Sequence, residues 1–227
     1  MTQPRADFYA ALGPDGLADL VDPAKTKADL RLVRGLCRGA TTVLDLACGY
    51  GRISLPLAQD GLQVAGLDLD AALIARARRD ARGLGLKLRY AVGDMRDLPY
   101  RDGSFTRVLC LWSSFQHLHS RRDQVRCLDE CWRVLRPGGT AYIEMTDGGD
   151  PVIERRLARE GRGPLRRLAR WRLHGGEIAC FLHNTATLSA AAAASQAAGF
   201  AVVAPRVVHR IQPVSYTHLT LPTNREV

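Results

Sequence analysis

Short apolar runs alternate with amphipathic stretches along most of the chain. The runs have the length and aliphatic character of buried strands, and they lie at residues 41–47, 63–70, 87–94, 104–112 and 140–145. The stretches between them repeat apolar positions at helical spacing, and they lie at residues 52–59, 71–85 and 121–136. This alternation predicts an α/β fold with a doubly wound, mostly parallel sheet and helices on both of its faces.

The segment before the first strand is predicted to be helical. Over residues 5–38, helical spacing places Leu30, Val33, Leu36 and Cys37 on one face. We expect residues 1–40 to form an N-terminal helical lid, followed by a single ligand-binding domain.

The segment after the fifth strand is less regular. An irregular basic insertion at 148–176 precedes a helix expected at 187–200 and a sixth strand at 201–208. We place the end of the ligand-binding domain, which begins at residue 41, at residue 213.

The last fourteen residues, 214–227, differ in composition from the rest of the chain. They contain neither Ala nor Gly, although both are abundant elsewhere. The stretch VSYTHL can be back-translated into the transposon-end adapter of sequencing libraries. We therefore expect a non-native tail and leave it out of the fold prediction.

Composition and charge fit one globular domain. Hydrophobic residues make up 46% and charged residues 24%, and the net charge is +9. Only three of the basic residues are lysines, against 29 arginines, which GC-rich codons would produce whatever the function. The charge alone therefore does not predict nucleic-acid binding. The chain has no apolar run long enough for a spanning helix and no secretory signal, so we expect a cytoplasmic protein with no membrane partner.

The six cysteines do not follow the spacing of a disulfide framework or a zinc site. Cys127 and Cys131 are four residues apart, so they would share a helix face and pack in the core. We expect reduced thiols, mostly buried, and no metal.

A glycine loop follows the first strand, in the stretch VLDLACGYGR at residues 43–52. Gly49 and Gly51 fit the dinucleotide fingerprint, but its third glycine is replaced by Ser54. Asp45, just before the loop, would repel a pyrophosphate. The ammonium and sulfonium of S-adenosylmethionine would instead be attracted by it, so the loop favours that ligand.

Acidic residues also end the next two strands. Asp68 can accept two hydrogen bonds from a ribose diol, and Asp94 can accept one from the amine of adenine. Leu69 and Met95, beside them, can supply apolar faces for the purine. The carboxyl ends of parallel strands converge on one crevice, so we expect these residues to lie together.

These stretches resemble the class I S-adenosylmethionine-dependent methyltransferases of the small, single-domain type. The resemblance rests on VLDLACGYGR, VAGLDLD, VGDMRDLPY and WRVLRPGGTAYIEM, and it covers about residues 30–146. It implies that the loop of Ala47, Cys48, Gly49 and Gly51 holds the methionine moiety, with Asp45 nearby.

The same resemblance implies roles at the other strand ends. Asp68 would take the ribose hydroxyls, and Asp94 with the Met95 backbone would take the adenine. Near the methyl group, the resemblance places three residues that leave the fourth strand: Leu111, Trp112 and Ser113. The family's sheet also has a final antiparallel strand between the fifth and sixth. Only the suspected tail is left to supply that strand, so we expect a truncated C-terminus.

Methyl transfer is an in-line displacement that depends mainly on alignment. A base is needed only when the acceptor must lose a proton early, and His117 is the candidate. His117 could instead pack against the following helix, and His119 is expected in an exposed loop. Tyr9 could fold over the site as part of the lid, or simply pack.

Eight arginines lie between residues 155 and 172. They could shape a pocket for an acidic acceptor, contact RNA with Trp171 as a stacking residue, or form a solvated helix. We expect a small-molecule methyl acceptor. Alternatives are an RNA methyltransferase, a dinucleotide-dependent oxidoreductase and a non-catalytic S-adenosylmethionine-binding protein.

Overall fold

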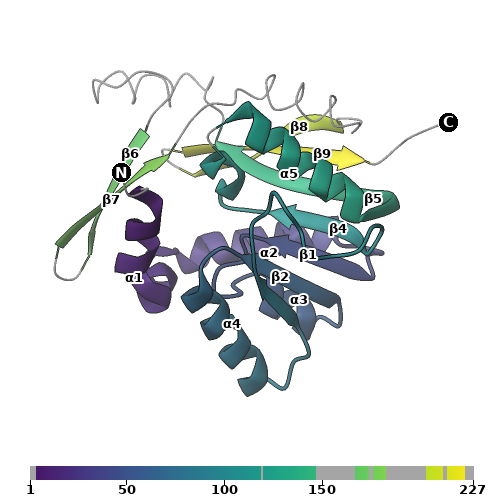
Figure 1. The fold of residues 1–227 in the computed structure, drawn as a ribbon, viewed down its shortest axis with the longest axis horizontal. Coiled ribbons are helices and arrows are strands. Elements are labelled where there is room, and N and C mark those ends of the chain that lie inside the picture. Colours follow the sequence, from purple (N-terminus) through teal and green to yellow (C-terminus); the bar gives the residue numbers. More distant parts are fainter. Residues whose placement is uncertain are drawn as a thin grey trace.

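A seven-stranded sheet organises the molecule (Figure 1), in the strand order β3-β2-β1-β4-β5-β9-β8. The computed structural model describes residues 4–118 and 120–146, and the backbone of four further strands, at 167–173, 176–182, 203–211 and 214–222. Five strands pair in parallel: β1 (Thr42–Leu46), β2 (Gln63–Asp68), β3 (Arg89–Val92), β4 (Phe105–Cys110) and β5 (Leu135–Thr146). The predicted α/β fold is therefore confirmed.

Helices cover both faces of the parallel strands. One face of β1 buries Leu44 and Leu46 in a cluster with α5 (Arg121–Val134), which supplies Cys127, Leu128 and Cys131. The opposite face buries Val43 against α2 (Pro23–Leu36) and α3 (Ser54–Gln59). The alternation of side chains along each strand produces these two layers, and the buried cysteines belong to them as free thiols.

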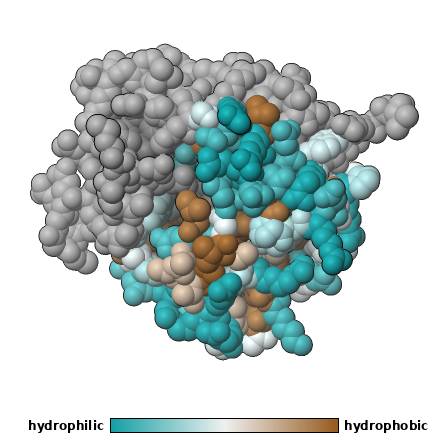
Figure 2. Space-filling model, in the orientation of Figure 1, coloured by the Kyte–Doolittle hydropathy of each residue, from teal (hydrophilic) through white to brown (hydrophobic). Residues whose placement is uncertain are grey.

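On the same face as α2 and α3, α4 (Ala71–Gly83) packs against Tyr90 of β3. Gly66 of β2 lies opposite Tyr90, and a Cβ atom at Gly66 would stand 2.6 Å from the Tyr90 ring. In the view of Figure 2, polar residues cover α4 and α5, and apolar residues gather between them.

The N-terminal segment, predicted to be helical, forms two helices. The first, α1 (Pro4–Leu20), is kinked at Gly13, which has a φ of 62° before Pro14. The second, α2, begins after Asp22, whose side chain accepts a hydrogen bond from the amide of Ala24 at 2.7 Å. A separate hairpin of β6 (Arg167–Leu173) and β7 (Gly176–Leu182) lies beside α1 (Figure 1).

Two boundaries differ from the sequence prediction. Helix α5 ends at Val134 and β5 starts at Leu135, whereas we expected the helix to reach residue 136 and the strand to start at 140. The reason is a bulge: Phe105 of β4 pairs with Leu135, and regular pairing resumes only at Arg107 and Thr140.

The C-terminal stretch corrects a second expectation. Val214–Pro222 forms β9, antiparallel to β5 on one side and to β8 (Val203–Ile211) on the other. The sequence analysis excluded these residues from the fold, yet their Val, Thr, Tyr and Leu content suits a strand. That they are non-native stays a prediction. The basic segment at 148–166 and the helix expected at 187–200 lie outside the described residues.

Within the part of the chain that the structure describes, no helix combines the length and apolar character that crossing a membrane requires.

Candidate functional site

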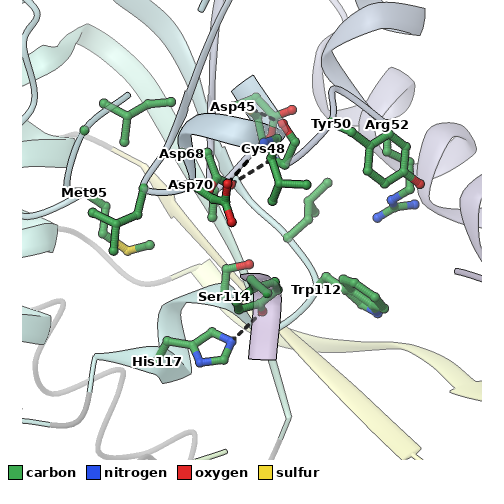
Figure 3. Close-up of a pocket in the computed structure, with 18 of the residues that line it drawn as sticks. Asp45, Cys48, Tyr50, Arg52, Asp68, Asp70, Met95, Trp112, Ser114 and His117 are labelled. Carbon is green, nitrogen blue, oxygen red and sulfur yellow. Dashed lines mark hydrogen bonds between the residues drawn. The ribbon is translucent and has the colours of Figure 1, made fainter. Parts of the chain in front are cut away.

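A cavity of about 530 Å³ lies over the carboxyl ends of the parallel strands. This is the volume range of small-molecule sites. Of the residues predicted to bind the cofactor, ten line the cavity: Asp45, Ala47, Cys48, Gly49, Asp68, Leu69, Asp94, Met95, Leu111 and Trp112. His117 lines it as well. Figure 3 shows Asp68 and Asp70 on one side, with Ser114 and His117 across from them.

Two predicted residues lie beside the cavity rather than on its wall. A Cβ atom at Gly51 would come within 2.7 Å of the Tyr90 hydroxyl, so this glycine, with a φ of 88°, allows loop packing against β3. Ser113 is buried, and the next residue, Ser114, lines the cavity in its place.

The carboxylate of Asp68 is held by two backbone amides. Its Oδ2 accepts a hydrogen bond from the Gly49 amide at 2.8 Å, and its Oδ1 accepts one from the Asp70 amide at 2.9 Å. The first of these bonds ties the glycine loop to the end of β2 (Figure 3). A carboxylate with this fixed orientation, facing a cavity, suits recognition of a diol.

Asp45 is a buried acid with an unmatched oxygen. Among the described residues, its Oδ2 has no hydrogen-bond partner. Burial raises the pKa of Asp45 to about 7, and nearby Arg52 and a hydrogen bond with Ser54 oppose that rise. The Asp45 carboxylate therefore suits a cationic donor entering from the cavity.

Arg52 faces the same end of the cavity as Tyr50, opposite Met95 (Figure 3). Its Nη1 lies 2.8 Å from Oδ2 of Asp29, and it donates to the Thr26 hydroxyl at 3.3 Å. Both partners are on α2. The guanidinium is thus a fixed positive charge next to Asp45, a combination that suits a ligand carrying both an ammonium and a carboxylate.

The ion pair of Arg52 continues into a buried network. Lys25 on α2 lies 2.7 Å from Oδ1 of Asp29 and 3.1 Å from Oε1 of Glu144, at the end of β5. Oε2 of Glu144 accepts the backbone amide of Trp112 at 2.9 Å. Lys25, Asp29 and Glu144 are all buried. Four charges of alternating sign therefore connect the glycine loop to the loop after β4.

The loop after β4 has a strained backbone. Trp112 and Ser113 both adopt left-handed conformations, with φ values of 55° and 58°. Such conformations cost about 1–3 kcal/mol each for residues other than glycine, and they persist only where surrounding contacts enforce them. The bond from Trp112 to Glu144 is one such contact. It holds the backbone of Trp112, a residue of the cavity wall, in this conformation.

His117 and Tyr9 meet at the cavity from opposite ends of the sequence. His117 lies in a short 3₁₀ helix, η1 (Ser114–His117), and is buried. Its Nε2 lies 3.2 Å from the Tyr9 hydroxyl, with the two rings edge to face at 6.0 Å. The chain beyond η1 reaches His119, which lies outside the described residues.

The opposite end of the cavity carries a second charged group. Asp94, the second residue after β3, accepts hydrogen bonds from Arg96 through both carboxylate oxygens. Arg96 also contacts Asp123 in the first turn of α5, and all three line the cavity near Met95.

The family comparison identifies this arrangement. Residues 43–139, which include the glycine loop and the strand ends described above, match the family model of a methyltransferase domain. This part of the chain is therefore similar to methyltransferase domains.

Similar sequences agree with this assignment. The chain is 35% identical over 159 residues to a glycine/sarcosine N-methyltransferase of Parasynechococcus marenigrum, covering 66% of this chain and 53% of the relative. It is 35% identical over 123 residues to a demethylmenaquinone methyltransferase of Thermus thermophilus, covering 51% of this chain and 54% of that one. The chain thus spans about half the length of these curated relatives.

Solved structures show the same fold. A 1,6-didemethyltoxoflavin-N1-methyltransferase of Burkholderia thailandensis, with bound S-adenosylhomocysteine, superposes with a TM-score of 0.69 at 22% identity. The match covers 97% of this chain and 87% of that one. A methyltransferase of Clostridium acetobutylicum gives a TM-score of 0.70 at 14% identity, covering 97% and 98%.

The cavity is also lined by residues that we did not single out from the sequence. Among the polar and aromatic residues these are Tyr50, Arg52, Asp70, Arg96, Ser114 and Asp123. Arg52 and Arg96 directly follow predicted site residues, so their place in the motifs was an available signal. Leu17 of α1 and Val21, between α1 and α2, also line the cavity. No local signal marks them.

Proposed function

We propose that the protein transfers a methyl group from S-adenosylmethionine to a small-molecule acceptor, by in-line displacement. The observation that carries this proposal is the Tyr9–His117 pair, which brings a hydroxyl and an imidazole to the cavity at the end of β4. The relatives support a small acceptor, because their names specify glycine, sarcosine and demethylmenaquinone.

The cavity residues suggest how the cofactor lies. Its ribose faces Asp68, and its adenine lies at the end with Asp94, Met95 and Leu69. The methionine moiety lies on the glycine loop, where Asp45 faces the ammonium and Arg52 the carboxylate. The unmatched oxygen of Asp45 supports this fit, since an ammonium donor would satisfy it.

The bound cofactor supplies an electrophilic methyl carbon on a sulfonium. The protein's contribution is alignment and proton removal. Trp112 and Leu111 hold the acceptor side of the cavity, and Nε2 of His117 takes the proton that leaves the acceptor atom. The proton can pass directly or through Tyr9, whose hydroxyl then gives its own proton to Nε2 and takes the acceptor's.

The experiment is a transfer assay with deuterated-methyl S-adenosylmethionine and panels of small amines, phenols, hydroxy acids and RNA, read by mass spectrometry. We expect transfer to a small molecule. The variant His117→Gln should lower kcat about 100-fold, the lower range for loss of a general base, while leaving the Kd for S-adenosylhomocysteine unchanged. Tyr9→Phe should lower kcat less, because Nε2 remains.

Other outcomes would point to the other functions. Transfer only to RNA would establish an RNA methyltransferase, in which the arginines of the segment at 155–172 would be the place to look for phosphate contacts. Tight binding of the cofactor product without transfer to any acceptor would indicate a non-catalytic binding protein.

The raised pKa of Asp45 predicts a pH-dependent affinity. Below pH 7, Asp45 takes up a proton and the ligand's ammonium loses its charged partner. The affinity for S-adenosylhomocysteine should therefore be highest above pH 7 and fall below it. Well below pH 7, the loss of affinity should approach about tenfold per pH unit. Calorimetry between pH 5.5 and 7.5 measures this. Asp45→Asn should bind weakly with a flat profile, and a flat profile in the wild type would remove the role of Asp45.

A further inference from the structure

Arg96 bridges two carboxylates that come from different elements of the fold. Its Nε donates to Oδ1 of Asp94 at 3.0 Å, and its Nη2 donates to Oδ2 of Asp94 at 2.6 Å. Its Nη1 donates to Oδ1 of Asp123 at 2.8 Å. The guanidinium therefore binds the Asp94 carboxylate in a planar, bidentate arrangement and connects it to α5 through Asp123.

Both ends of this bridge are themselves fixed. The backbone amide of Arg96 also donates to Oδ1 of Asp94, at 2.9 Å. On α5, the hydroxyl of Ser120 donates to Oδ2 of Asp123 at 2.8 Å, and the Asp123 amide donates back to that hydroxyl at 3.0 Å. Neither carboxylate can turn without breaking bonds, so the orientation of Asp94 toward the cavity is set in advance.

We propose that Arg96 is a positioning residue that makes the site select adenine over a 6-oxopurine, by fixing the Asp94 carboxylate as a hydrogen-bond acceptor. The inference rests on the proposed function, in which Asp94 faces the adenine amine. Adenine presents an amino donor at C6, whereas hypoxanthine presents a carbonyl acceptor there. A carboxylate held in one orientation accepts from the first and repels the second. A released carboxylate could turn away from the carbonyl, and the discrimination would be lost.

The test compares the dissociation constants of S-adenosylhomocysteine and S-inosylhomocysteine by calorimetry. The inosine ligand carries a carbonyl in place of the amino group at purine position 6, and its N1 is protonated. We expect the wild type to prefer the adenine ligand about 10- to 100-fold, the range for one well-placed polar contact to a base. Arg96→Met should weaken adenine binding, strengthen inosine binding because the released carboxylate can turn away from the carbonyl, and reduce the preference to within about threefold.

Arg96→Lys separates the planar fork that holds Asp94, called the clamp here, from the positive charge of residue 96. Lysine keeps the positive charge but lacks the planar fork, so the clamp predicts that the preference falls in this variant too. Full preference in Arg96→Lys would assign the effect to charge and overturn the inference. Full preference in Arg96→Met would overturn it as well, because Arg96 would then only join β3 to α5.

Arg133 provides a matched control. It also bridges two carboxylates, Glu130 and Asp102, but it does not line the cavity. Arg133→Met should lower the melting temperature without changing the ratio of the two dissociation constants. If that ratio changed equally in both arginine variants, general loosening would explain it and the clamp would be excluded. Failure of the wild type to bind either ligand would instead remove the cofactor orientation proposed above.

Discussion

Asp68→Ala should weaken the binding of S-adenosylhomocysteine about 100-fold or more. Hydrogen bonds to a charged acceptor contribute about 1.5–3 kcal/mol each, and the proposed ribose diol makes two of them. The same substitution removes the acceptor of the Gly49 amide, which ties the glycine loop to β2 at 2.8 Å. Calorimetry on the purified variant measures the change.

Two further variants serve as comparisons for the affinity of Asp68→Ala. Asp68→Asn keeps one acceptor oxygen without the charge, so we expect a loss of about tenfold. Asp102→Ala removes an exposed acid that does not line the cavity, and it should bind as the wild type does. If Asp68→Ala retained wild-type affinity, the ribose would have to lie elsewhere, and the cofactor orientation proposed from the strand ends would be wrong.

Glu144→Ala should lower the free energy of unfolding by about 3–5 kcal/mol. Removing Glu144, which lies 3.1 Å from Nζ of Lys25, leaves the two buried cations Lys25 and Arg52 to share one carboxylate, that of Asp29. One buried positive charge is then uncompensated. The amide of Trp112 would also lose its acceptor, in a backbone that is already strained. Urea denaturation, followed by circular dichroism, measures the loss.

Two control variants separate the effect of losing the charge of Glu144 from the effect of breaking an ion pair that is exposed. Glu144→Gln keeps an acceptor for the Trp112 amide, so its effect should be intermediate. Asp60→Ala breaks an exposed ion pair with Arg34, where solvent already screens both charges, and it should change the unfolding free energy little. Equal losses in Glu144→Ala and Asp60→Ala would show that the buried network does not stabilise the fold.

Much of the cavity wall at the strand ends could be predicted because its signals are local. Asp45 and Asp68 lie at the ends of β1 and β2, Asp94 lies just after β3, and parallel strands bring their carboxyl ends to one edge. The structure places all three at one cavity. Gly51 shows the limit of that reasoning. Its place in the motif suggested ligand contact, but its close approach to Tyr90 depends on how β3 packs.

The pairing of Tyr9 with His117 could not be predicted in the same way. Tyr9 and His117 are separated by 108 positions, and nothing in either neighbourhood indicates the other. The sequence analysis weighed both residues singly, and for each it left packing open. Their hydrogen bond depends on the kinked path of α1 over the strand ends.

The sequence by itself determined the alternation of parallel strands and helices along the chain, the apolar faces of those elements and the acidic residues at the strand ends. These follow from side-chain periodicity and from the fixed geometry of parallel strands, which act over a few residues. Only the tertiary structure decided which charges meet: Lys25 with Glu144, 119 positions apart, and Arg96 with Asp123. An ion pair depends on distances between elements, and those distances are set by packing rather than by local pattern.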